Sequence, residues 1–180
     1  MRGVSQRFTL ENMAFDPQPT LKGELLELRP LRADDFPELH AVASDPLIWE
    51  QHPNSDRYQE TVFREFFQGA IKSGGALVAL DRKTGRIIGS SRYSGFAAGG
   101  SEVEVGWTFL ARSHWGGGYN GEMKRLMLGH AFGVFRSVVL VIGPKNIRSQ
   151  KAAEKIGAVR IENRIGTDGL EKVVYRINAP

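Results

Sequence analysis

Apolar and polar residues alternate most regularly in residues 101–110, where Val103, Val105 and Trp107 are separated by polar residues or glycine. A period of two residues predicts a strand with one buried face. Residues 138–142 form a continuous aliphatic run, which is typical of a strand buried on both faces. These two segments are the clearest strands that the pattern predicts.

Apolar residues at helical spacing predict two helices in the first half of the chain. The first begins after Asp34 or Asp35, whose side chains can accept the free N–H groups of a helix start, and it stops at the following Asp-Pro pair. The second begins after Ser55 or Asp56 in the same way. It stops at the glycines of residues 73–75.

Two further helices are predicted in the second half. One opens in the glycine-rich residues 115–121, and the other spans residues 146–156 and ends at Gly157. The remaining strands are expected at 24–30, 76–80, 86–93, 158–165 and 170–177. The resulting order, β-α-α-β-β-β-α-β-α-β-β, is that of a mixed α/β domain. Residues 1–20 lack such a pattern, so we expect an N-terminal extension followed by one domain over residues 21–180.

Composition excludes several classes of protein. The chain has 180 residues, no cysteine, and four histidines without the His-x3-His spacing of zinc enzymes. Disulfides and a cysteine nucleophile are therefore excluded, and no metal is expected. The longest aliphatic run has five residues, whereas a membrane span needs about 20. No secretion signal is visible, so we expect a cytoplasmic protein with no membrane partner.

Charge adds little to this picture. The formal net charge is +4, and the basic residues are scattered along the chain. Proteins that bind nucleic acid usually concentrate their basic residues in one stripe or patch. We therefore expect no nucleic-acid partner.

Glycine is the unusual component, with 21 of 180 residues against a usual share of about 7%. Residues 116–121, which we call the glycine cradle, join a predicted strand to a predicted helix. A helix start exposes unpaired N–H groups and the positive end of the helix dipole. Glycines let an anion approach those N–H groups closely. The segment therefore predicts a binding site for a phosphate-bearing ligand.

Two common phosphate motifs fit this segment poorly. Gly116-x-Gly118-x-x-Gly121 matches the dinucleotide fingerprint, but that fingerprint needs an acidic residue after the next strand to hold the ribose. Residues 138–142 are followed instead by Gly-Pro-Lys. A P-loop would need Lys and then Ser or Thr after its last glycine, where this chain has Glu122. A nucleotide-dependent oxidoreductase is therefore disfavoured.

The cradle and the downstream segment Asn146–Gly157 together resemble the GNAT superfamily of acyl-CoA-dependent N-acetyltransferases, in particular the branch of ribosomal-protein N-terminal acetyltransferases. The resemblance runs from about Leu25 to Ile177 and includes Glu-Val-Gly-Trp at residues 104–107. It implies a single GNAT-like domain. Its mixed, mostly antiparallel sheet would have about seven strands, one splayed strand pair and about four helices.

The resemblance also implies which residues bind acetyl-CoA as co-substrate. In the family the pyrophosphate lies on backbone N–H groups of the cradle, the pantetheine arm pairs with the end of the central strand, and an Asn-x-x-Ser on the next helix lies near the thiol. In this chain these positions are Gly116, Gly117, Gly118, Tyr119, Asn120 and Gly121, then Trp107, Thr108, Phe109 and Leu110, and finally Asn146 and Ser149.

The chain departs from the family at two positions. Ser113 stands where the family often has Arg or Gln, and Ala153 stands where a tyrosine often serves as the acid for the leaving thiolate. Ser149 is therefore our candidate to interact with the departing sulfur. His52 lies between the first two predicted helices, where the family places part of its acceptor pocket, and is our candidate substrate residue.

Amide formation from a thioester also needs a base that takes a proton from the amine, directly or through water. Glu104 is the first candidate, because it lies on the central strand just before the expected splay. Glu102, two residues away on the same face, is the fallback.

The leading hypothesis is an enzyme that transfers acetyl from acetyl-CoA to a primary amine by direct attack in a ternary complex. The alternative is a non-catalytic acyl-CoA-binding or regulatory module on the same fold. The acceptor stays open among a protein N-terminus, a free amino acid, a polyamine and an aminoglycoside. We expect a small-molecule or peptide acceptor and a monomer or homodimer.

Overall fold

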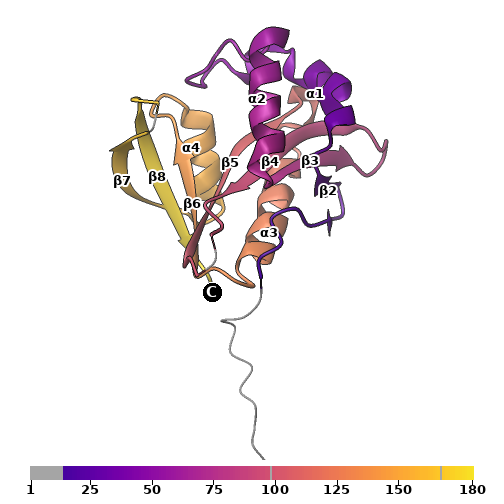
Figure 1. The fold of residues 1–180 in the computed structure, drawn as a ribbon. Coiled ribbons are helices and arrows are strands. Elements are labelled where there is room, and N and C mark those ends of the chain that lie inside the picture. Colours follow the sequence, from indigo (N-terminus) through magenta and orange to yellow (C-terminus); the bar gives the residue numbers. More distant parts are fainter. Residues whose placement is uncertain (1–13, 98, 167) are drawn as a thin grey trace, which may run out of the picture.

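The computed structural model describes residues 14–97, 99–166 and 168–180. Their elements follow the predicted order, with one additional short strand at the start (Figure 1). One open sheet has the strand order β1-β2-β3-β4-β5-β6-β8-β7, and all neighbours are antiparallel except β5 and β6. The strands are β1 (Leu21–Lys22), β2 (Leu26–Pro30), β3 (Ala76–Asp81), β4 (Ile87–Ser94), β5 (Glu102–Leu110), β6 (Ser137–Ile142), β7 (Val159–Ile165) and β8 (Glu171–Asn178).

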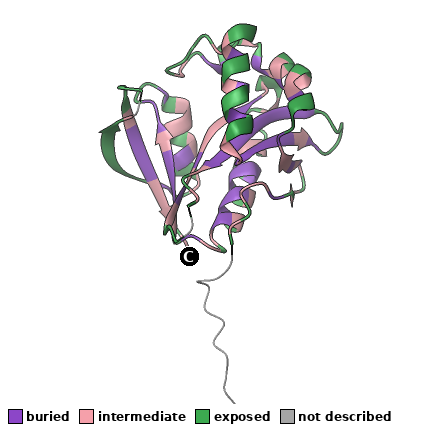
Figure 2. Ribbon diagram, in the orientation of Figure 1, coloured by how far each residue is buried: buried purple, intermediate pink, exposed green. Residues whose placement is uncertain are grey.

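Helices cover both faces of this sheet. The α-helices are α1 (Phe36–Ala43), α2 (Glu60–Ser73), α3 (Tyr119–Ala131) and α4 (Ile147–Lys155). Leu77 and Val78 are neighbours on β3 and point to opposite faces, so Leu77 packs in a hydrophobic cluster with α3, and Val78 packs in one with α1 and α2. The strands between these layers are buried, whereas β7 is exposed along its length (Figure 2).

The parallel strands β5 and β6 pair only over their first residues. Glu102–Glu104 lie beside Ser137–Val139, and no pair follows them. On the other side of β5, the register with β4 shifts between Ser90 and Arg92, and Trp107 has a positive φ of 51°. A bulge of this kind bends and twists a strand. The splayed strand pair is thus confirmed, and it opens a space in the middle of the sheet.

Glu122 fixes the start of α3 to the edge of the sheet formed by β1 and β2. Its buried carboxylate accepts the backbone N–H groups of Glu24, Leu25 and Leu26 at 2.8 to 2.9 Å. These bonds satisfy backbone donors in the turn between β1 and β2 and at the first residue of β2. The glycine cradle, which immediately precedes Glu122, is therefore held in a defined place.

One predicted helix cap is wrong, and the other is confirmed in position but not in its hydrogen bond. The residue that precedes α2 is Gln59, so Ser55 and Asp56 lie in a turn outside the helix. Asp35 does precede α1, but it makes no cap bond to that helix. Its carboxylate instead pairs with the Arg29 guanidinium at 2.7 Å and accepts the Arg32 N–H at 2.8 Å. A charged partner forms a stronger hydrogen bond than a neutral helix amide.

Part of the expected N-terminal extension packs on the domain. The Phe15 ring lies edge-on to Tyr93 and Phe135, with ring centres 5.1 and 4.9 Å apart. The backbone oxygen of Asp16 lies 2.7 Å from His130 Nε2. We propose that the domain begins at or before Phe15. The rest of the predicted extension, residues 1–13, lies outside the described residues.

None of the helices in the described ranges is long and apolar enough to cross a membrane. The same ranges contain no group of three His, Asp or Glu side chains that could hold a metal ion.

Candidate active site

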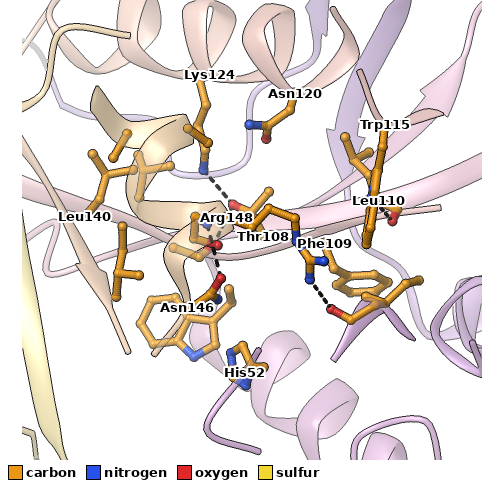
Figure 3. A pocket seen from close by; sticks show the side chains of 18 of the residues that line it. His52, Thr108, Phe109, Leu110, Trp115, Asn120, Lys124, Leu140, Asn146 and Arg148 are labelled. Carbon is orange, nitrogen blue, oxygen red and sulfur yellow. Dashed lines mark hydrogen bonds between the residues drawn. The ribbon is translucent and has the colours of Figure 1, made fainter. Parts of the chain in front are cut away.

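A cavity of about 300 Å³ lies where β5 and β6 diverge, and the starts of α3 and α4 contribute to its walls (Figure 3). The fold brings together here residues that are far apart in the sequence. Nine of the predicted site residues line it: His52, Trp107, Thr108, Phe109, Leu110, Gly116, Asn120, Asn146 and Ser149.

The glycine cradle begins at this cavity and continues into α3. Gly116 and Gly118 have φ values of 74° and 87°, a conformation that favours glycine. The first backbone bond of the helix runs from Glu122 N–H to Gly118 O, so residues 119–121 lack helical partners for their N–H groups. Gly117, Gly118, Tyr119 and Gly121 are outside the cavity lining. The three glycines are exposed, so their amides are open to a ligand at the cavity mouth.

Tyr119 contributes to the cradle only through its backbone. Its hydroxyl donates to Asp81 Oδ1 at 2.9 Å, and this hydrogen bond raises the pKa of the phenol. Asp81 lies on β3, which does not line the cavity. The Tyr119 side chain is thus engaged in a contact within the fold.

The bulge interrupts the pairing of β5 at the cavity wall. Trp107 and Thr108 have no partner in the register of either neighbouring strand, and both residues line the cavity. The Thr108 hydroxyl lies 2.8 Å from Ser91 Oγ, so it is fixed against β4.

The start of α4 forms the facing wall. Asn146 Oδ1 accepts the N–H of Ser149 at 3.1 Å and so caps the helix. Both side chains line the cavity, and so does Ala153, which is buried with 2% exposure. The position where the family often has a tyrosine therefore faces the site without a hydroxyl.

The two candidate bases have different surroundings. Glu104 lies just before the cavity-lining part of β5, and burial raises the pKa of its carboxyl, although Arg164 and Arg92 act in the opposite direction. The Glu102 carboxylate already has two partners, because it pairs with Arg176 Nε at 2.7 Å and accepts a hydrogen bond from the Ser137 hydroxyl at 3.0 Å. The structure therefore favours Glu104 over the fallback.

His52 lines the cavity but is a poor base. Its Nδ1 accepts the N–H of Asn54 at 3.1 Å, and its Nε2 lies 3.2 Å from a guanidinium nitrogen of Arg57. Burial, followed by the nearby positive charges of Arg57 and Lys172, lowers its pKa to about 3. The imidazole is neutral near pH 7, so it can shape the site but accepts protons poorly.

The cavity residues that were not predicted from the sequence include Trp115, Lys124 and Arg148. Arg148 lies with its guanidinium carbon 4.1 Å from the ring centre of Trp115, and it donates to Ile48 O at 2.9 Å. The helical pattern of α3 could have indicated that Lys124 is buried, because it lies among the buried positions Met123, Met127 and Leu128. No local pattern marks Arg148, whose partners come from other elements.

The profile of the acetyltransferase (GNAT) domain family matches residues 26–159. Among solved structures, the chain is similar to a GNAT-family acetyltransferase from Bacillus anthracis (18% identity, 89% of this chain and 98% of that chain, TM-score 0.73). It is similar to a GCN5-related N-acetyltransferase from Brucella melitensis (18%, 93% and 83%, TM-score 0.75). It is also similar to Mycobacterium smegmatis RimJ in complex with CoA-disulfide (18%, 90% and 87%, TM-score 0.68). At these identities the likeness shows a shared fold. A sequence search of curated proteins returns no significant match.

Proposed function

The chain belongs to the GNAT family of acetyltransferases, and we propose that it transfers acetyl from acetyl-CoA to a primary amine by direct attack in a ternary complex. The family resemblance stated from the sequence is confirmed by the profile match. The acceptor, the direct attack and the roles of individual residues are our proposal.

One observation carries the proposal: the glycine cradle, the bulged part of β5 and the start of α4 meet at a single cavity. In the proposed complex the pyrophosphate of acetyl-CoA lies on the N–H groups of residues 116–121. The pantetheine arm pairs with backbone groups of residues 107–110, of which Trp107 and Thr108 have no register partner in the sheet. Asn146 and Ser149 then lie beside the thioester.

A positive charge is available beside the cradle, although Ser113 replaces the Arg or Gln of the family. Arg148 stacks on Trp115, the residue directly before Gly116. A guanidinium is well suited to bind phosphate oxygens. We assign Arg148 to the pyrophosphate, where it would add to the attraction of the backbone amides.

Glu104 is the proposed base. Because burial raises its pKa, its carboxylate holds a proton more readily near neutral pH than an exposed glutamate does. Glu104 lies outside the cavity lining, so the proton passes through water. We assign the backbone N–H groups of Trp107 and Thr108, which have no register partner in β4 or β6, to stabilise the oxyanion that forms when the amine attacks the carbonyl.

Positive groups surround Glu104 and His52, and they bear on the choice of acceptor. Arg92 is buried with 9% exposure, its Nε has no hydrogen-bond partner among the described residues, and its guanidinium faces the Trp107 ring at 4.7 Å. Arg57 lies beside His52. Burial lowers the pKa of both arginines only to about 10, so both are charged near pH 7.

Such a site repels a polycation and attracts an acceptor that carries a carboxylate or phosphate besides its amine. A free amino acid or an acidic peptide fits these charges better than a polyamine or an aminoglycoside. The turnover of matched amines that differ only in a carboxylate, such as an amino acid and its amide, tests this preference. Acceptors with the carboxylate are expected to react faster than those without it.

The first experiment compares CoA and NAD by thermal shift. CoA at 100 times its dissociation constant adds about 2.7 kcal/mol of apparent stability, and NAD adds none. Gly121→Asp puts a carboxylate beside the pyrophosphate position, at a cradle glycine without positive φ where a side chain meets no neighbouring atom within 4 Å. It abolishes the CoA shift while circular dichroism stays native. No shift with millimolar CoA contradicts the proposal.

Turnover distinguishes the enzyme from the non-catalytic module. Thiol release from acetyl-CoA is measured with a panel of a peptide N-terminus, an amino acid, a polyamine and an aminoglycoside. Amine-dependent release supports catalysis. CoA binding without release to any amine favours the acyl-CoA-binding module instead.

A further inference from the structure

Lys124 is a buried lysine in the wall of the cavity. It lies on α3, is 6% exposed, and donates from Nζ to the Thr108 hydroxyl at 2.6 Å (Figure 3). The salt bridges of the described residues include none to Lys124. Its amine therefore has one neutral hydrogen-bond partner and no counter-ion.

The surroundings of this amine are almost free of charge. Burial lowers its pKa to about 7, and no charged neighbour contributes to the shift. On α3, the nearby charges of Glu122 and Arg125 pair with each other. From the opposing elements, β5 presents the Thr108 hydroxyl, while His52 and Arg148 are the other ionisable groups that line the cavity.

Burying an ionisable amine without a counter-ion opposes folding. Lysines of this kind in a cavity are associated with proton transfer, because their pKa lies near the working pH. The position of Lys124 is also informative. Its partner Thr108 directly follows Trp107, the bulged residue with positive φ, and Ser149 and Ala153 line the same cavity from α4.

In the proposed function the acetyl thioester lies in this part of the cavity, and its sulfur leaves as a thiolate that must gain a proton. Of the three ionisable side chains that line the cavity, His52 is neutral with a pKa of about 3. Arg148 cannot release a proton in the working range of a protein. The serine hydroxyl of Ser149 is a weak acid, and the Tyr119 hydroxyl is bound to Asp81.

We propose that Lys124 is the catalytic acid, which supplies the proton to the departing CoA thiolate in place of the missing tyrosine. This inference rests on the proposed function. The amine nitrogen of the acceptor bonds to the acetyl carbon and gives up one proton through water to Glu104, the C–S bond breaks, and the electron pair of that bond stays on sulfur. The Lys124 ammonium gives one proton to sulfur and becomes a neutral amine, and the proton taken up by Glu104 returns to Lys124 through the solvent.

The first test needs CoA alone and no acceptor. An ammonium close to the sulfur favours the thiolate, so the thiol of bound CoA ionises at lower pH in the wild type than in Lys124→Met, by about 1–3 pH units. The ultraviolet absorbance of the thiolate reports the titration. Lys151→Met, which removes an exposed lysine of α4, is the matched control and leaves the titration unchanged.

Equal thiol titrations in the wild type and in Lys124→Met would overturn the proposal, provided that both bind CoA in the thermal-shift assay. If the wild type does not bind CoA, the proposed function itself fails. If the wild type binds CoA and Lys124→Met does not, the thiol of bound CoA is titrated in Lys124→Arg instead. This variant keeps the positive charge, so the thiol pKa is expected to stay as low as in the wild type.

The second test separates proton donation from fixed charge. Turnover is followed against pH with the panel amine that the wild type uses fastest. The wild-type kcat falls as pH rises above about 7, because the ammonium form of Lys124 is lost. Lys124→Arg lowers kcat by about 10²-fold or more, because a guanidinium does not release its proton, while the KM for acetyl-CoA changes little. Wild-type turnover in the arginine variant would show that Lys124 acts only as a charge, and would overturn the assignment as acid.

Discussion

Two ionisable side chains on α3, only two residues apart, are both buried but differ in the partners that compensate for the burial. Glu122 is 5% exposed and accepts three backbone N–H groups, with Arg125 beside it at 3.2 Å. Burial alone would raise its pKa, but these partners outweigh burial and the pKa is lowered. Lys124 has one neutral hydroxyl partner and a pKa of about 7.

We use this difference to separate residues that hold the fold from residues proposed to serve the reaction. A buried charge with its hydrogen bonds satisfied keeps its charged form and fixes the structure around it. In a buried ionisable group that lacks such partners, burial favours the neutral form instead. Glu104, with its raised pKa near the cavity, belongs with Lys124 in the second group.

Removing Glu122 is expected to have the largest effect. Glu122→Ala leaves the N–H groups of Glu24, Leu25 and Leu26, in the turn before β2 and at its first residue, buried or partly buried without acceptors. The free energy of unfolding therefore falls by about 3–5 kcal/mol. Arg125→Met is the matched control, since the Arg125 side chain is 72% exposed, and it costs less than about 1 kcal/mol. Urea denaturation measures both. Equal losses in the two variants would mean that the ion pair, rather than the backbone contacts, carries the stability.

Replacing Glu104 tests whether a buried group with a raised pKa takes part in the reaction, and the readout is enzyme activity. Glu104→Gln keeps the shape but cannot accept a proton, so kcat falls roughly 10²–10⁴-fold with little change in the CoA dissociation constant. Steady-state kinetics measures kcat, and calorimetry measures the CoA dissociation constant. A change in kcat below about threefold contradicts the assignment, and a large loss in Glu102→Gln instead would move the role to Glu102.

Lys124→Met is expected to stabilise the protein, in contrast to Glu122→Ala. Methionine removes the cost of burying the amine, so the free energy of unfolding rises by about 1–4 kcal/mol at pH 7. The gain depends on pH. In the folded protein the pKa is about 7, and in the unfolded chain it is about 10.4, so between these values the unfolded chain binds more protons and wild-type stability rises with pH.

The stability difference between wild type and Lys124→Met therefore narrows from pH 7 to about pH 10. Urea titrations across that range measure it. A methionine variant that is less stable than the wild type at pH 7 would show that Lys124 supports the fold, as Glu122 does.

Ser149→Ala is expected to have the smallest effect. The hydroxyl contributes at most one hydrogen bond to the leaving sulfur, so kcat falls by the equivalent of about 1.5–3 kcal/mol, and CoA affinity falls less. Single-turnover kinetics and CoA titration separate these quantities. Unchanged kcat with weaker CoA binding would make Ser149 a binding residue only.

Much of the site was predictable from short segments. The glycine cradle is read from residues 115–121, because strand, glycines and helix follow one another in the chain and make their own N–H groups available. The α4 start at Asn146 is equally local. The helix caps at Ser55, Asp56 and Asp35 were predicted less well, since the chain offers several capping residues and tertiary partners such as Arg29 decide among them.

The sequence alone determined the order of the elements, the two apolar strand patterns and the glycine-rich start of α3, because these depend on neighbouring residues and on periods of two or 3.6. Only the tertiary structure decided which charged side chains are buried and what they meet. Lys124 reaches Thr108 on β5, Arg148 reaches Trp115, and Glu122 reaches the turn before β2. Proton affinity depends on such contacts between distant segments. The helix pattern can therefore mark Lys124 as a buried position, but only the folded chain shows that its amine lacks a counter-ion.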